Sequence, residues 1–155
     1  MYQINMENKC PKCSNTVDLN IGRCGKCGYD LKKIFDLIRE GDKFLNQQKY
    51  PDAFECYEKA IKLDKKNALA WYGKGNVLLS QGKNSEGVTY CVNCQLSPVL
   101  SEAFYKDAIK CYEKSIGINP NFKNAWHQKA IALDKLGQHL EAKKCFEVAE
   151  DLGKK

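Results

Sequence analysis

The chain of 155 residues is long enough for one ordinary domain, or for a small module followed by a larger one, and its 43% hydrophobic and 28% charged residues are typical of a soluble, folded protein. No stretch reaches the roughly 18 consecutive apolar residues of a membrane span, and the opening MYQINMENK lacks the apolar core of a secretory signal. We therefore expect a cytoplasmic protein whose nine cysteines stay reduced. The formal net charge of +6 comes mostly from lysines spread along the chain, which favours a solvated surface over a nucleic-acid-binding face.

Residues 10–28 hold four cysteines in two pairs, CPKC and CGKC, with two residues inside each pair. Zinc takes four soft ligands in a tetrahedron, and a tight C-x2-C turn directs two sulfurs at one point. We therefore predict one structural zinc ion, with no open position for water, bound by Cys10, Cys13, Cys24 and Cys27. The ligands do not distinguish zinc from iron. A thioredoxin-like redox pair would instead place one C-x2-C at a helix start.

The residues between the two pairs favour a short β-strand, because Val17, Leu19 and Ile21 alternate with polar residues. Together with the cysteines, this segment resembles a zinc ribbon of the rubredoxin-knuckle type and defines a first domain at 1–30. Metal binding would supply the folding energy that so short a segment cannot obtain from a core. Only about five residues separate the ribbon from the first helix, so we expect it to cap the helical part.

Three later segments share one pattern: an alanine, a cysteine three residues later, an aromatic residue next to it, and a small residue after three more. They are PDAFECYEKAIKLDKKN, KDAIKCYEKSIGINPNF and LEAKKCFEVAEDLGKK. This spacing forms one face of an amphipathic helix. The helices that precede these segments carry a second pattern, with spacings of four and then three residues, as in Trp71, Gly75 and Leu78.

These patterns resemble the tetratricopeptide repeat (TPR), W-x2-L-G-x2-Y followed by A-x3-F and P. The leucine of the motif is replaced by Glu40, Lys74 and Lys129. The resemblance implies a mainly α fold, a TPR-like superhelix of about three repeats preceded by the small β zinc ribbon. The TPR part is expected at 34–155, and its three repeats at 34–67, 68–122 and 123–155.

The second repeat is longer than the motif, which predicts an insertion at about 84–104 between its helices. The insertion contains Cys91 and Cys94, which we interpret as core residues of an extra helix ended by Pro98. A metal or thiol role, shared between two chains, is the alternative for this pair. The remaining cysteines repeat at one position and are expected to be buried: Cys56, Cys111 and Cys145.

The TPR resemblance implies a non-enzymatic adaptor that binds an extended or helical segment of a partner protein in a concave groove lined by first helices. No catalytic motif is present in the sequence. The expected groove residues are Ile38, Asp42, Leu45, Tyr72, Asn76, Leu79, His127, Ile131 and Asp134. The sequence ends directly after the last expected helix, which favours self-association through an uncapped C-terminal end.

TPR domains that capture chaperone C-terminal carboxylates use lysine, arginine and asparagine in the groove. Ile38, Asp42 and Gln128 occupy positions where such groups are needed, and Asn76 alone matches, which argues against a carboxylate clamp.

An alternative function is a nucleic-acid-associated factor whose ribbon contacts RNA or DNA while the TPR part recruits a protein. Lys12, Arg23 and Lys26 lie on the knuckles and would make the contact. Tyr29 is the one aromatic residue nearby, and base stacking usually needs more, so this is the weaker prediction.

Overall fold

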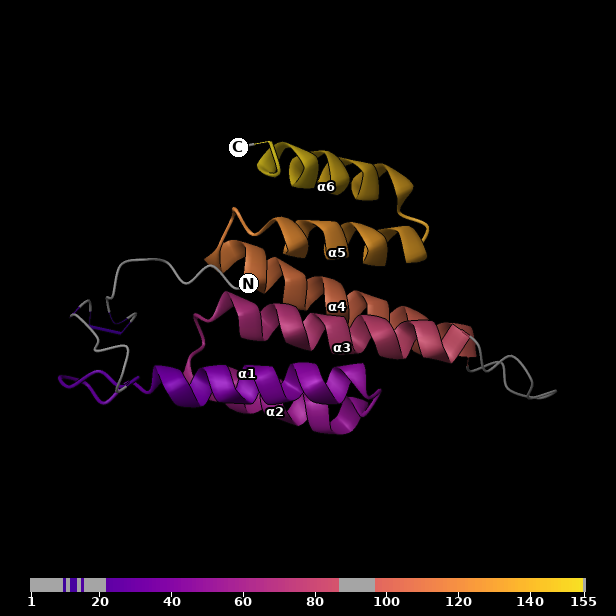
Figure 1. The fold of residues 1–155 in the computed structure, drawn as a ribbon. Helices are drawn as coiled ribbons and strands as arrows, with labels where there is room; N and C mark the ends of the chain where they lie inside the picture. Colours follow the sequence, from indigo (N-terminus) through magenta and orange to yellow (C-terminus); the bar gives the residue numbers. More distant parts are fainter. Residues whose placement is uncertain (1–9, 11, 14, 16–21, 87–96, 155) are drawn as a thin grey trace.

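The computed structural model describes residues 10, 12, 13, 15, 22–86 and 97–154. This part of the chain holds six α-helices and no strand (Figure 1). The helices are α1 (Leu31–Asn46), α2 (Tyr50–Leu63), α3 (Ala68–Glu86), α4 (Ser97–Ile118), α5 (Lys123–Lys135) and α6 (His139–Leu152). The predicted mainly α fold is confirmed, whereas the predicted β-strand at 17–21 lies outside the described residues.

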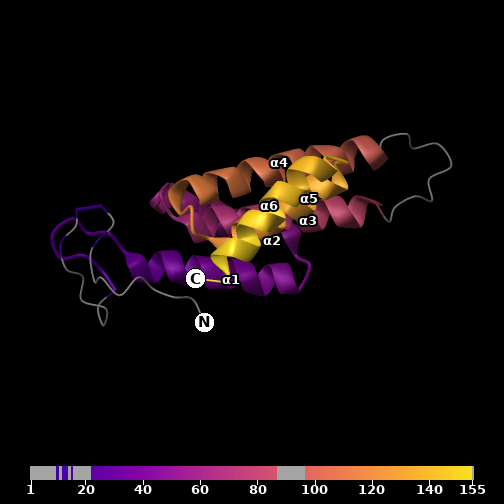
Figure 2. The same ribbon diagram turned by 90° about the horizontal axis from the view of Figure 1, so that it is seen from above.

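Each helix packs against the next one in the chain, and the helices stack in one direction from α1 and α2 to α6 (Figure 1). The first helices of successive pairs also meet, α1 with α3 and α3 with α5. Helix pairs stacked in this way form the predicted TPR-like superhelix. The α3–α4 pair extends past the other helices when the molecule is viewed from above (Figure 2).

Helix starts follow the capping signals in the sequence. The Asp30 side chain accepts a hydrogen bond from the backbone N–H of Lys33 at the start of α1 (2.9 Å), and Asn67 does the same for Ala70 at the start of α3 (3.0 Å). Pro51 lies in the first turn of α2, where its missing N–H costs no helical hydrogen bond.

Both tryptophans of the motif fasten the connection that precedes their own helix. The indole N–H of Trp71 donates to the carbonyl of Lys65 (3.0 Å), and that of Trp126 donates to the carbonyl of Pro120 (2.8 Å). Each bond spans six residues, so the same contact fastens the connection between repeats at two places.

Two of the three residues that replace the leucine of the motif are lysines, and each faces a glutamate of the preceding helix. Lys74 of α3 forms an ion pair with Glu58 of α2 (2.8 Å), and Lys129 of α5 forms the equivalent pair with Glu113 of α4 (2.9 Å). Both lysines are mostly covered, and Lys74 lowers the pKa of Glu58 through a direct hydrogen bond. The substitution therefore exchanges an apolar contact for a repeated ion pair between adjacent helix pairs.

The core between helices is built from tyrosine rings that lie against glycines. Tyr57 of α2 is fully buried and packs against Gly41 and Gly73, while Tyr112 of α4 packs in the same way against Gly75. Because glycine has no side chain, the ring can approach the neighbouring backbone closely.

The longer second pair repeats this packing nearer its tip. Tyr105 of α4 lies against Gly82 of α3, as Tyr112 lies against Gly75. Residues 84–86 of the expected insertion belong to α3 and residues 97–104 belong to α4, so its described ends continue the two helices. Cys91 and Cys94 lie outside the described residues.

The prediction that Pro98 ends a helix is wrong, because Pro98 lies in the first turn of α4. Proline suits either end of a helix. It cannot continue a helix from the preceding turn, but its fixed φ angle and missing N–H fit the first turn.

Gly82→Ala is expected to lower the free energy of unfolding by about 1–3 kcal/mol, since overpacking a filled core costs this much. A Cβ at Gly82 would lie 2.5 Å from Cε1 of Tyr105, so the ring would have to move. Gly117→Ala is the matched control, because nothing lies within 4 Å of a Cβ at that position of α4. Urea unfolding measures both variants, and a Gly82→Ala chain as stable as Gly117→Ala would contradict the close packing.

Candidate functional site

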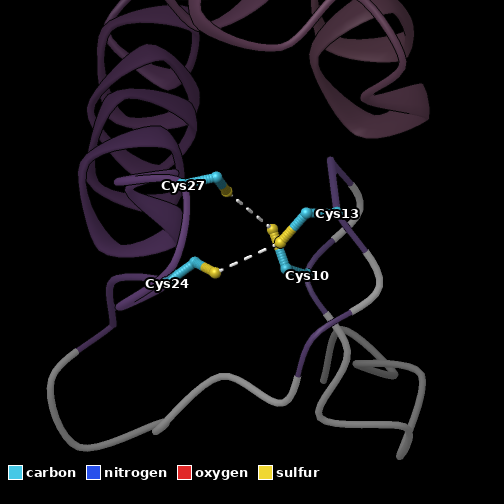
Figure 3. Close-up of side chains that lie close together, drawn as sticks. All are labelled: Cys10, Cys13, Cys24 and Cys27. Atoms are coloured by element: carbon cyan, nitrogen blue, oxygen red, sulfur yellow. Dashed lines mark hydrogen bonds between the residues drawn. The ribbon is translucent and has the colours of Figure 1, made fainter.

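The structure brings the four predicted cysteines together. The sulfur atoms of Cys10, Cys13, Cys24 and Cys27 all lie within 4.8 Å of one another (Figure 3). The Cys10–Cys27 and Cys13–Cys24 sulfur distances are 3.4 and 3.5 Å, and all four are free thiols. A tetrahedron with Zn–S bonds of about 2.3 Å has sulfur–sulfur edges of about 3.8 Å. The four sulfurs therefore fit a zinc-sized ion, and no other such cluster occurs in the part of the chain that is described.

The two cysteine pairs fold into turns of the same kind. The backbone N–H of Cys10 donates to the carbonyl of Asn15 (2.7 Å), and that of Cys24 donates to the carbonyl of Tyr29 (2.8 Å), five residues on in both cases. Gly28, directly after the second pair, has a φ angle of +68°, which a residue with a side chain rarely adopts. Matching sequence pairs thus form matching turns that face one another.

The surroundings of the cluster lower the pKa of one thiol, Cys24, and raise that of another, Cys27. The backbone N–H of Cys27 lowers the pKa of Cys24 to about 6. The pKa of Cys27 is raised to about 12, because burial and the neighbouring thiols outweigh the backbone N–H of Tyr29 that favours its thiolate. Four adjacent thiols do not all ionise without a cation among them, and thiolates are the form that binds metal.

The cysteine cluster is joined to the first helix pair. Tyr29 is 8% exposed, and its hydroxyl donates to Asp64 at the end of α2. Burial and Asp64 together raise the pKa of Tyr29. Cys10 and Cys24 belong to the same hydrophobic core as Ile34 of α1 and buried residues of α2. The sequence placed this segment before the first helix but did not show that Tyr29 contacts a residue 35 positions later.

The expected groove residues lie on the three first helices, which meet in order. Two of them are largely buried, Ile38 at 5% and Leu79 at 3% exposure. Asp42 accepts a hydrogen bond from the Tyr57 hydroxyl (2.6 Å), and Asn76 accepts one from the Tyr112 hydroxyl (2.9 Å).

The other expected groove residues are more accessible. Tyr72 packs against the ring of Phe122, with centroids 4.9 Å apart, and His127 meets the edge of Phe146 at 5.3 Å. Asp134 is exposed and lies 2.7 Å from a ring nitrogen of His139. Leu45 and Ile131 are half-buried. The face therefore presents a mixture of rings, aliphatic groups and carboxylates.

A cavity of about 170 Å³ opens on α1 and the start of α3. Its apolar lining comes from Phe35, Ile38 and Leu69. Asp42 also lines it, together with Arg39, which is paired with Asp36 at 2.9 Å. This cavity is large enough for one apolar side chain of a bound segment.

The cysteines of the helical repeats are packing residues, as predicted. Cys56, Cys111 and Cys145 are buried at 6%, 6% and 8% exposure. Burial raises the pKa of all three thiols, in Cys111 to about 11. They remain protonated at neutral pH and behave as small apolar groups.

Two family models match the chain, one described as TPR repeat at 41–82 and one as tetratricopeptide repeat at 111–144. These two segments of the chain therefore match TPR repeats. TPR domains are typically binding modules without catalytic activity. None of the described helices is both long enough and apolar enough to cross a membrane.

The Hsp70-Hsp90 organizing protein of Triticum aestivum is 24% identical over 106 residues, which cover 60% of this chain and 18% of that protein. Among solved structures, the second TPR of Spaghetti (RPAP3) bound to the HSP90 peptide SRMEEVD aligns with a TM-score of 0.62 and 24% identity, covering 78% of this chain and 93% of that one. The TPR2B domain of yeast Sti1 in its Hsp70 complex gives a TM-score of 0.62 at 19% identity, over 77% and 79%.

These likenesses show the fold, which is shared with the TPR domains solved in complex with an HSP90 peptide and with pHsp70. The chain spans less than a fifth of the length of the first curated relatives that it matches.

Proposed function

We propose that this chain is a non-enzymatic cytoplasmic adaptor. Its TPR helices bind a segment of a partner protein along α1, α3 and α5, and a zinc ion fastens the segment before α1 to the first helix pair. The observation that carries the proposal is the stack of helix pairs with rings, aliphatic groups and a cavity on its first helices. The likeness to TPR domains with bound peptides supports it.

The zinc ion is proposed to be structural and to bind Cys10, Cys13, Cys24 and Cys27. Four thiolates complete a tetrahedral coordination and leave no position for a reacting water. The metal would stabilise a ribbon at 1–30 and the core that Cys10, Cys24 and Tyr29 share with the first helix pair. Iron in the same ligand set is the alternative metal.

The chemistry of the groove favours a neutral or basic segment with an apolar side chain. The nine expected groove residues include Asp42 and Asp134 and contain neither lysine nor arginine. The one arginine beside the cavity, Arg39, already pairs with Asp36. An apolar side chain of the partner would enter the cavity between Phe35 and Leu69.

Affinity capture from the native cell extract tests the groove. The wild-type chain, the groove variant Phe35→Ala/Ile131→Ala and the outer-surface variant Lys144→Ala serve as parallel baits. We expect a partner that wild type and Lys144→Ala retain and that the groove variant loses. Equal capture of the same proteins by all three baits would contradict binding in the groove.

A further inference from the structure

A second cleft lies where the metal segment meets the end of the first repeat. Its volume is about 640 Å³, larger than that of the cavity on α1. Its lining comes from three parts of the chain that are distant in sequence: the metal segment, the start of α1, and the end of α2 with the following turn. Ile34 and Tyr29 form its buried wall.

Six cationic side chains converge on this cleft: Lys12, Arg23, Lys33, Lys62, Lys65 and Lys66. The two carboxylates in the lining, Asp30 and Asp64, are already engaged. Asp64 accepts hydrogen bonds from the Tyr29 hydroxyl and from the backbone N–H of Lys66, while Asp30 caps α1 and lies 3.4 Å from Arg23. Among the described residues, none of the five lysines forms an ion pair, so their charge is available to an anionic ligand.

The lining also has an apolar part but offers no ring for stacking. Leu63 is 45% exposed between the lysines of α2 and the next turn. Tyr29, the one aromatic residue of the lining, is 8% exposed and its hydroxyl is bonded to Asp64. Nucleobases bind through stacking on exposed rings, whereas a peptide with carboxylates around an apolar side chain matches lysines around a leucine.

We propose that this cleft, named here the basic cleft, binds an acidic peptide segment that carries an apolar side chain. The proposal rests on the adaptor function and gives the partner a second contact, outside the groove. In the groove an acidic segment would meet Asp42 and Asp134 with no lysine or arginine among the expected groove residues, whereas in the basic cleft six cationic side chains outnumber two carboxylates. Because the lysines are exposed, the attraction is screened by salt.

Fluorescence anisotropy with a labelled SRMEEVD peptide and the zinc-loaded full chain tests this proposal. The charge-reversal variant Lys62→Glu/Lys65→Glu is expected to bind the peptide about tenfold more weakly or worse, because opposed charges replace attracting ones. The matched control Lys83→Glu/Lys144→Glu makes the same change of net charge at exposed lysines outside both cavities and should retain wild-type affinity. Zinc content and unfolding midpoint verify that both variants are folded.

Two further measurements separate the basic cleft from the groove and from simple charge attraction. The groove variant Phe35→Ala/Ile131→Ala should bind SRMEEVD as wild type does, even where it loses the captured partner. The peptide SRMQQVN, in which amides replace the three side-chain carboxylates, should bind much more weakly than SRMEEVD. Loss of SRMEEVD binding in the groove variant alone would place the acidic segment in the groove and overturn the proposal.

Several other results would also overturn it. No detectable binding of SRMEEVD by wild type would do so, as would an equal loss of affinity in both charge-reversal variants. A single-stranded oligoadenylate RNA that binds more tightly than the peptide, and whose binding Lys62→Glu/Lys65→Glu abolishes, would assign the basic cleft to nucleic acid.

Discussion

Cys24→Ser is expected to abolish zinc binding and to unfold the metal segment while α3 to α6 stay helical. Cys24 Sγ lies 3.5 Å from Cys13 Sγ, and serine is a poor substitute for a thiolate ligand. Structural zinc contributes about 10–16 kcal/mol of apparent folding free energy in isolated peptides. Elemental analysis should find one zinc ion per wild-type chain and none in the variant, and circular dichroism should show most of the helix retained.

Cys56→Ala is the matched control, since it also removes one buried thiol but lies outside the cluster. It should keep one zinc ion per chain and lose only packing energy. A full zinc content in Cys24→Ser would show that this residue is not a ligand. Iron in place of zinc, with the same loss in Cys24→Ser, would keep the ligand set and change the metal.

Tyr57→Ala is expected to lower the free energy of unfolding by about 3–5 kcal/mol, as removal of large buried rings does. The Tyr57 ring is fully buried where α1, α2 and α3 meet, against Gly41 and Gly73, which have no side chains to fill the space it would leave. Because small domains are stable by only about 5–15 kcal/mol, this variant would lose a large share of its stability. Urea unfolding followed by circular dichroism measures the change.

Tyr57→Phe separates packing from hydrogen bonding at the same position. It keeps the ring and removes only the hydroxyl that donates to Asp42, so the expected cost is about 1 kcal/mol. Equal losses in the two variants would show that the hydrogen bond, and not the ring, dominates. In that case the contact of the ring with the two glycines would have little energetic weight.

The helical fold could be predicted because its signals are local and repeated. The alanine, cysteine and aromatic positions recur in three segments, and the spacing alone placed Cys56 and Tyr57 on a buried face. The metal cluster could also be predicted, since each C-x2-C motif brings two ligands together within one turn and two such motifs supply all four.

Other features depend on distant parts of the chain and could not be predicted. The contact of Tyr29 with Asp64 and the convergence of lysines on the basic cleft arise only when the metal segment packs on the first repeat. Likewise, repeat register placed Ile38 and Leu79 on the first helices, but the extent of their burial depends on neighbouring helices. The role of Pro98 was misjudged because proline marks either end of a helix.

The spacing of the glycine–tyrosine contacts in the α3–α4 pair has a consequence for the length of this hairpin. Gly75 and Gly82 are seven residues apart, as are Tyr105 and Tyr112 on the opposite helix. Seven residues are close to two helical turns of about 3.6 residues each. Adding or removing one such block from both helices therefore preserves the facing surfaces, so the reach of the hairpin can vary between proteins in discrete steps without any redesign of its interior.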